Sequence, residues 1–267
     1  MSSGSRVLSI AGLFVAAASA AVFGQGVPVT LQWFETSWQT MEDRTADAFI
    51  AGYDQMLANF GLDNWHLFAK QTIRGPNWKI AYDGYMDLYH LPVLHRNTIG
   101  ANASNQALYY PWGPHQRVIS PNRQIALADV PVEEWPAESL MIGVWTIFPH
   151  ISIASFRGGG RSIMLSQLFP GESVGESFTT QYYLMESAPD EQQAEEARKQ
   201  FALLRTVVED EDYATGFLQQ RALKAGGREF VLFGRNEGGG HRFHNWVERL
   251  LNTADADLNT LFAGAND

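Results

Sequence analysis

The apolar residues of this chain recur at steps of three and four in several stretches, which is the spacing that predicts amphipathic helices. One stretch covers residues 41–60, with apolar positions at Phe49, Tyr53, Met56, Leu57 and Phe60. A second helix is predicted over roughly residues 78–91. The longest begins after Asp190, a residue suited to an N-cap, and stops at the glycine pair starting at Gly226. A last helix is predicted from about residue 241 to 251.

Between residues 107 and 186 the pattern changes to short apolar or alternating runs that are broken by proline and glycine. The runs are "SLMIGVWTIFPHISIASF", "RSIMLSQLF" and "ESFTTQYYLME", and they predict several antiparallel strands. The order is therefore helix, helix, strand block and long helix. This order predicts an α+β fold in which an antiparallel sheet packs one face on helices.

Composition narrows the possible functions. The 267 residues are 45% hydrophobic and 12% aromatic, enough for a substantial core in one large or two small domains. The net charge is −10, and the 19 Lys and Arg residues form no dense run, which argues against a nucleic-acid partner. The chain has no cysteine, so it holds no disulfide, no thiolate nucleophile, no zinc-thiolate site and no cysteine-ligated iron–sulfur cluster.

The first 40 residues differ from the rest. They contain one basic residue, Arg6, an apolar run from about Val7 to Phe23, and small residues at positions 18–20. This is the pattern of a signal peptide, and the alternative is an apolar piece of a truncated reading frame. Because the run is short and rich in alanine, we expect no stable membrane span. Residues 41–267 are assigned to one domain. A cytoplasmic location is expected, and the apolar N-terminal segment leaves export as the alternative.

The segment "GPNWKIAYDGYMDLYHLPVLHRNTIG", residues 75–100, gathers two histidines and two aspartates among aromatic residues. On a continuous helix His90 and His95 would point about 140° apart and could not share an ion. Pro92 lies between them, so the helix is expected to end or kink there and to let the imidazoles converge. Asp87 precedes His90 by three residues and is expected to approach its second ring nitrogen. Asp83 lies one turn earlier on the same predicted face.

Two imidazoles are only part of a coordination sphere, so a metal site would need a third ligand from elsewhere. If the metal is Fe(II), the expected partner is one carboxylate. The densest acidic run is Glu209–Asp212, inside the long predicted helix, where apolar neighbours on both sides leave one acid able to face the core. The other interpretation of the histidines is hydrogen-bonded core residues with no metal.

The string "NWKIAYDGYMDLYHLPVLH" resembles the catalytic-domain signature of Rieske-type non-haem iron oxygenases, the large (alpha) subunits of aromatic ring-hydroxylating enzymes. In that family an Asn-Trp-Lys element precedes a helix that carries Asp, two residues, His, four residues and a second His. The matching residues here are Asn77, Trp78, Lys79, Asp87, His90 and His95. The likeness covers roughly residues 46–252.

The resemblance implies a role for each matched residue. His90 and His95 would be Fe(2+) ligands, and Asp87 would couple a Rieske cluster to the iron. Asp83 stands where many relatives have an Asn near the metal. For the third ligand, Asp212 matches the family pattern best and Asp210 is the runner-up. The other histidines, at positions 66, 115, 150, 241 and 244, are interpreted as structural or surface residues.

The resemblance also implies a helix-grip fold like that of START and Bet v 1 domains, with a curved antiparallel sheet wrapped on a long C-terminal helix. The expected function is hydroxylation of an apolar, aromatic substrate with O2, by a monooxygenase or a dioxygenase. The family's Rieske domain holds its [2Fe-2S] cluster partly through cysteine residues. The chain has no cysteine, so this sequence does not include that domain. Either the chain is a fragment of a longer oxygenase or the electron-transfer module is a separate polypeptide. We expect a fragment that is inactive without a Rieske electron donor.

The implied partners are a reductase and ferredoxin chain and, in the full-length family, further subunits in a homotrimer or hetero-oligomer. The alternative function is a non-catalytic helix-grip module that binds an apolar ligand. The absent electron donor motivates this alternative, and iron content discriminates the two.

Overall fold

The computed structural model describes residues 48–124, 129–135, 142–226 and 231–262 of the chain. The N-terminal segment of residues 1–40 and the start of the helix expected over residues 41–60 lie outside the described residues. The contacts divide the chain into two units, one of residues 63–110 and 116–241 and the other of residues 1–62, 111–115 and 242–267. The first unit contains the segment with the paired histidines.

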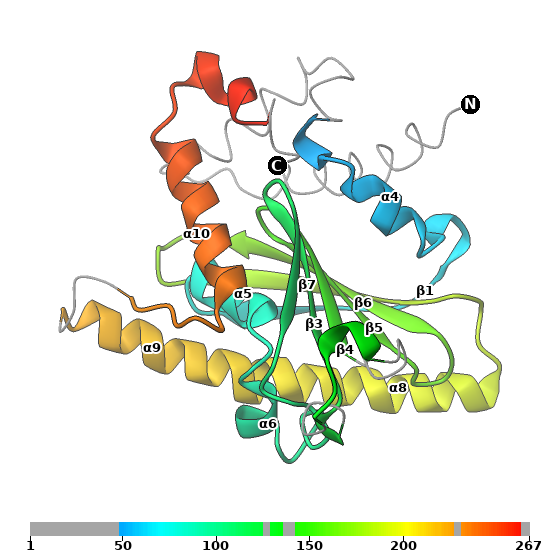
Figure 1. Cartoon of the computed structure of the whole chain (residues 1–267). Coiled ribbons are helices and arrows are strands. Elements are labelled where there is room, and N and C mark those ends of the chain that lie inside the picture. Colours follow the sequence, from blue (N-terminus) through cyan, green and yellow to red (C-terminus); the bar gives the residue numbers. More distant parts are fainter. Residues whose placement is uncertain (1–47, 125–128, 136–141, 227–230, 263–267) are drawn as a thin grey trace. The chain divides into compact units, whose positions relative to one another are not determined.

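The strand block β2–β7 follows helices and precedes the long helix, which is the order that the α+β interpretation requires, and Figure 1 shows the arrangement of the elements within each unit. The α-helices are α4 (Tyr53–Ala58), α5 (Trp78–Met86), α6 (Leu91–Leu94), α8 (Glu191–Thr206), α9 (Ala214–Lys224) and α10 (Gly238–Leu251). The strands are β1 (His66–Gly75), β2 (Leu108–Trp112), β3 (His115–Ser120), β4 (Ile142–Ile147), β5 (Ile151–Phe156), β6 (Ser162–Pro170) and β7 (Ser177–Met185). Short 3₁₀ helices cover Leu62–Asn64, Val132–Glu134 and Asp255–Leu261.

The seven strands form one sheet in the order β1-β7-β6-β5-β4-β3-β2. The pairings from β1 through β7, β6, β5 and β4 to β3 are all antiparallel. The predicted strand block is confirmed, but the sequence analysis missed β1, which lies between the first two predicted helices. Its burial does not alternate regularly, so its sequence carries no clear period of two.

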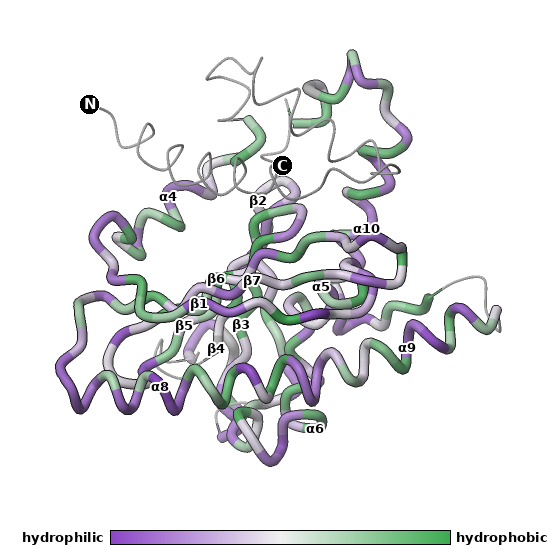
Figure 2. Tube along the Cα trace, turned by 180° about the vertical axis from the view of Figure 1, so that it is seen from behind, coloured by the Kyte–Doolittle hydropathy of each residue, from purple (hydrophilic) through white to green (hydrophobic). Residues whose placement is uncertain are grey.

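The long C-terminal helix is confirmed and is continuous from α8 to α9. Asp190 caps it, because its side chain accepts a hydrogen bond from the Gln193 N–H while the Gln193 side chain accepts one from the Asp190 N–H. A π-helical segment, Val207–Tyr213, joins the two halves. α8 is hydrophilic with interspersed apolar positions, as Figure 2 shows, and it buries only Ala197 and Leu204 fully.

Helix α5 contacts strands β4, β6 and β7 on one side and α9 and the π segment on the other. Its N-cap is Asn77, whose side chain accepts a hydrogen bond from the Lys79 N–H at 3.0 Å and donates to the Val174 carbonyl at 2.7 Å. The Asn77 N–H donates to Gln220 of α9 at 2.5 Å. Gly216 lets α9 approach, since a Cβ there would lie 2.8 Å from Pro76 Cγ. These contacts fix α5 between sheet and long helix.

The predicted helix over residues 78–91 is shorter than expected. α5 ends at Met86, with Asp87 in an extended conformation, and Leu91 begins the separate helix α6. Pro92 lies in the first turn of α6, where its missing N–H costs no hydrogen bond, instead of ending the preceding helix. The final helix is confirmed and begins three residues earlier than predicted.

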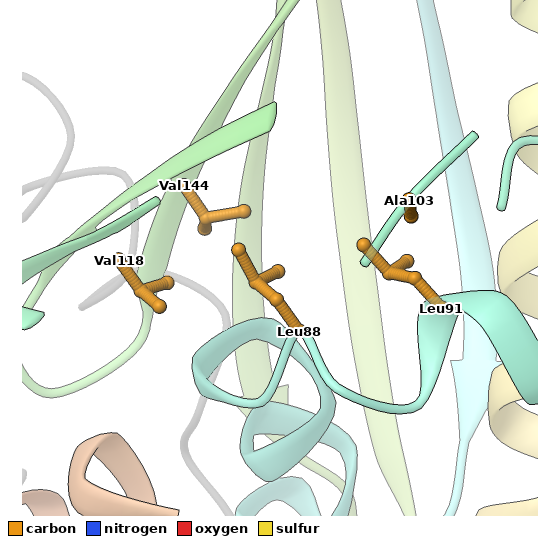
Figure 3. Packing of buried hydrophobic residues seen from close by; sticks show 5 residues of the cluster. All are labelled: Leu88, Leu91, Ala103, Val118 and Val144. Atoms are coloured by element: carbon orange, nitrogen blue, oxygen red, sulfur yellow. The ribbon is translucent and has the colours of Figure 1, made fainter. Parts of the chain in front are cut away.

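Hydrophobic contacts anchor the segment between α5 and α6. Leu88 and Leu91 are buried in one cluster with Ala103, Val118 and Val144. Figure 3 shows Leu88 pointing toward the valines of the sheet and Leu91 lying beside Ala103. Because these two leucines flank His90 in the sequence, their burial fixes the backbone on both sides of the imidazole.

The second unit has a small aromatic core of its own. The His115 ring is fully buried, stacks on Tyr53 at 5.6 Å between centroids, and donates from Nε2 to the Phe49 carbonyl at 2.8 Å. Burial lowers the pKa of His115 to about 4. Such a neutral, hydrogen-bonded ring fits the structural interpretation given to this histidine. Among the described residues, no helix is long and apolar enough to cross a bilayer.

The capping contacts of Asn77 generate a prediction. Asn77→Ala should lower the free energy of unfolding by about 1 kcal/mol, because it removes the α5 N-cap. For a domain of this size, that corresponds to roughly 2–4 °C in melting temperature. Asn77→Ser keeps a capping oxygen and loses the amide donor to Val174, so thermal unfolding should show a smaller loss. Equal losses in the two variants would contradict the capping role.

Candidate metal centre

His90 and His95 lie at the two ends of helix α6, one as its N-cap residue and the other as its C-cap residue. The two residues bracket one helical turn, and their imidazoles converge although positions five apart on a regular helix point about 140° apart. The two Nε2 atoms are 3.2 Å apart. The convergence expected from Pro92 is therefore present, but a second short helix produces it instead of a kink.

The carboxylate that meets both imidazoles comes from the π segment of the long helix. Asp212 Oδ1 lies 3.0 Å from His95 Nε2 and 3.5 Å from His90 Nε2. One ligand atom from each of the three residues lies within 4.8 Å of the others. Asp210 is exposed on the same helix and takes no part in this group. The structure thus brings together the set His90, His95 and Asp212.

A second layer of carboxylates contacts the outer nitrogen of each imidazole. Glu211 Oε2 lies 2.6 Å from His95 Nδ1 and also accepts a hydrogen bond from the Thr98 hydroxyl at 2.9 Å. Asp87 Oδ2 lies 3.6 Å from His90 Nδ1. With Nδ1 of each ring turned to a carboxylate, Nε2 of each ring is left for the centre of the group.

The charges of this group affect one another strongly. Burial opposes protonation of His90, but hydrogen bonding to Asp212 and Asp87 outweighs it and raises the pKa to about 9. Burial likewise opposes the charged form of Asp212, yet hydrogen bonds to the two histidines lower its pKa. Burial also opposes protonation of His95, but contacts with Asp212 and Glu211 outweigh it and raise its pKa. The arrangement therefore stabilises positive charge at its centre.

An open pocket of about 720 Å³ reaches the centre from outside. His90, Asp212 and Tyr213 line it, together with Asp83, Asp87 and apolar residues of α5, α9 and the segment from residue 231 to 233. Asp83 lies in this pocket wall and is not among the three converging residues. The pocket connects the centre to solvent beside Asp87.

The sequence analysis singled out neither Glu211 nor Thr98. Glu211 belongs to the acidic run and directly precedes Asp212, so the sequence shows that a second acid adjoins the candidate ligand. Only the fold shows that consecutive acids meet different nitrogens of one imidazole. Thr98 carries no sequence signal, because an isolated threonine three residues after a histidine is common in turns.

The donor set fits a divalent transition metal. Two imidazole nitrogens and one carboxylate oxygen, partly buried and facing one another, are the facial set that suits non-haem Fe(II) and leaves coordination positions open. The outer carboxylates are the partners that orient ligating histidines in such sites. Two histidines and one carboxylate beside the long helix of an α+β domain are a donor set of the kind found in mononuclear non-haem metal proteins.

The sequence and the fold agree with this class. Residues 62–253 match the family model of the ring hydroxylating alpha subunit, catalytic domain, and the chain belongs to this family. No curated protein matches the sequence. The helix-grip expectation for the fold is confirmed by solved structures of Rieske oxygenase alpha subunits.

Two of these structures illustrate the likeness. The quaternary ammonium Rieske monooxygenase CntA, in complex with an inhibitor, superposes with a TM-score of 0.58 at 15% identity over 76% of this chain and 55% of that one. Naphthalene 1,2-dioxygenase from Rhodococcus sp., bound to indole, gives 0.57 at 15% identity over 77% and 61%. This chain therefore spans less than two thirds of either structure.

Proposed function

We propose that this chain is the catalytic domain of a ring-hydroxylating oxygenase and holds one Fe(II) ion between His90, His95 and Asp212. The observation that carries the proposal is the convergence of His90 Nε2, His95 Nε2 and Asp212 Oδ1 at mutual distances of 3.0–3.5 Å. When bound, iron supplies the activation of dioxygen at the positions that three protein ligands leave open.

The protein contributes geometry to this chemistry. Glu211 accepts the Nδ1 proton of His95, which leaves the Nε2 lone pair facing the metal position. Asp87 faces Nδ1 of His90 in the same way, though at the longer distance of 3.6 Å. His95 is only 1% exposed, so on its side the centre is closed to bulk water.

Electrons must reach the centre from outside this sequence. A Rieske cluster needs two thiolates, and the chain contains no cysteine. Asp87 is the proposed coupling residue, since it contacts His90 on one side and lines the open pocket on the other. A cluster-bearing domain, fed by a reductase and ferredoxin chain, would therefore approach beside Asp87. An oligomer of catalytic subunits is one way to supply it.

The ligand assignment predicts the iron content of variants. His90→Ala, His95→Ala and Asp212→Ala should each lose stoichiometric Fe(II), because two ligands from one chain seldom hold this ion against dialysis. Asp210→Ala is the matched control and should keep about one iron per chain, since its side chain is exposed. Iron is measured by metal analysis after anaerobic reconstitution. Full iron in both histidine variants would contradict the assignment and favour a ligand-binding module without metal.

The outer contact of His95 predicts a smaller effect. Glu211→Gln should bind Fe(II) roughly 10- to 100-fold more weakly while still reaching about one ion per chain at saturation, because the carboxylate orients a ligand and is not one itself. The control is Glu209→Gln, an exposed residue of the same segment that pairs with Arg205. A competition titration with a chelator measures both affinities. Unchanged affinity in Glu211→Gln would show that the contact is incidental.

The electron path predicts a dependence on a partner. The iron-loaded chain with reductase and NADH should not turn over repeatedly by itself, because the chain cannot hold a cluster. Adding a cluster-bearing Rieske protein should restore product formation, and Asp87→Ala should keep its iron while losing this restored activity. Product formation is measured by chromatography, and oxygen uptake is measured on the same samples. Sustained turnover without the Rieske protein would refute the proposed electron source.

A further inference from the structure

The acids of the metal centre lie in the π segment, Val207–Tyr213, of the long helix. Its residues Glu211 and Asp212 meet the two nitrogens of the His95 ring. Turns of π-helix are rare and occur mostly as single turns inside α-helices. The contacts that hold this turn in place therefore bear on the geometry of the centre.

The π segment buries two side chains that are five positions apart. Val208 is 8% exposed and Tyr213 is 2% exposed. On a regular α-helix these positions would point about 140° apart. A π turn instead hydrogen-bonds residues five apart, which brings such positions toward one face. Glu209 and Asp210 between them are exposed, so the π geometry turns Tyr213 inward while the acids beside it reach solvent.

The buried Tyr213 side chain is attached to the sheet by a hydrogen bond. Its hydroxyl pairs with the hydroxyl of Thr179. Thr179 is fully buried on β7, where it is aligned with Ile73 of β1 and with Leu168 of β6. Because β7 is paired on both sides at this residue, the hydrogen bond joins the π segment to a rigid part of the sheet.

The Tyr213 ring also packs closely against the end of β1. A Cβ at Gly75 would lie 2.9 Å from Tyr213 Cε2 and 2.7 Å from Ser177 Oγ, so only glycine leaves room for the ring. Gly75 is aligned with Ser177 of β7. The ring contact and the hydrogen bond therefore attach Tyr213 to the same two strands, β1 and β7.

This attachment lies one residue from the carboxylate that meets both histidines. Asp212 Oδ1 is 3.0 Å from His95 Nε2 and 3.5 Å from His90 Nε2. A metal site requires its donor atoms to be held within about 0.5 Å of the productive geometry. The buried leucines on either side of His90 hold only the histidine side of the centre. The carboxylate side requires an anchor of its own.

We propose that Tyr213 is the positioning residue for Asp212. Its hydrogen bond to Thr179 and its packing on Gly75 hold the π turn against the sheet, so that the Asp212 carboxylate stays between the two imidazoles. The inference rests on the proposed metal site and adds the group that sets the place of its only carboxylate ligand. Tyr213 itself is not a ligand, and it acts through the backbone that it shares with Asp212.

The test removes each partner of the hydrogen bond. Tyr213→Phe and Thr179→Val should each bind Fe(II) roughly tenfold more weakly than the wild type in a competition titration with a chelator, as for other groups that orient a ligand. The double variant should lose no more than either single variant, because the two hydroxyls act through one hydrogen bond. Thr179→Ser keeps the hydroxyl and should retain the wild-type affinity.

A spectrum separates misplacement of the carboxylate from a general loss of affinity. The visible absorption of the Co(II)-loaded chain depends on the geometry of the donor atoms. It should change in Tyr213→Phe and in Thr179→Val, and it should match the wild type in Thr179→Ser.

Tyr183→Phe is the matched control. Tyr183 is a fully buried tyrosine of the same strand, its hydroxyl pairs with Ser162 at 2.8 Å, and it packs in a cluster with Ala197 and Leu204 of α8. Its loss should lower the melting temperature, because a buried hydrogen bond is removed. The Fe(II) affinity and the Co(II) spectrum should stay unchanged, since Tyr183 meets the half of the long helix that carries no acid of the centre.

Hydrogen exchange of the metal-free chain tests the anchor without any ion. The amides of residues 207–213 should exchange faster in Tyr213→Phe than in the wild type, and Tyr183→Phe should leave them unchanged. If the wild type binds no stoichiometric metal, the proposed function fails, and this measurement alone decides whether Tyr213 holds the segment.

Three results would overturn the proposal. These are a wild-type Fe(II) affinity in Tyr213→Phe, an equal loss of affinity in Tyr183→Phe, and unchanged exchange of residues 207–213 in Tyr213→Phe. The second result would mean that any loss of stability loosens the centre.

Discussion

The arrangement of the centre depends on one interaction, the contact of the buried His95 ring with two consecutive acids of the long helix. Glu211 meets Nδ1 and Asp212 meets Nε2, so both ring nitrogens are occupied by residues more than a hundred positions away in the chain. A buried imidazole with a raised pKa and two carboxylates are each costly to bury alone. Together they compensate one another, and a metal ion would compensate them further.

The rest of the first unit holds the two sides of this contact in place. On one side, Leu88 and Leu91 are buried against residues of the sheet and fix the backbone around His90. On the other, Asn77 and Gln220 join α5 to α9 beside the close approach at Gly216. By resemblance, the Asn-Trp-Lys element belongs to the catalytic signature. In this structure its residue Asn77 helps to position helix α5. The triad itself lies well downstream of it.

The sequence by itself determined the class of fold, the long capped helix and the candidate ligand residues, because periodicity, an Asp N-cap and a histidine pair beside aspartates are local signals. It could not predict the break between α5 and α6 or strand β1, since tertiary contacts override weak local preferences there. Spacing alone left Asp210 and Asp212 as alternatives. Only the folded chain separates them, because which face of a helix meets the histidines is set by packing. The alignment of polar residues across strands β5, β6 and β7 at Ser152, Ser166 and Gln181 could not be predicted either, since these residues become neighbours only through the register of the sheet.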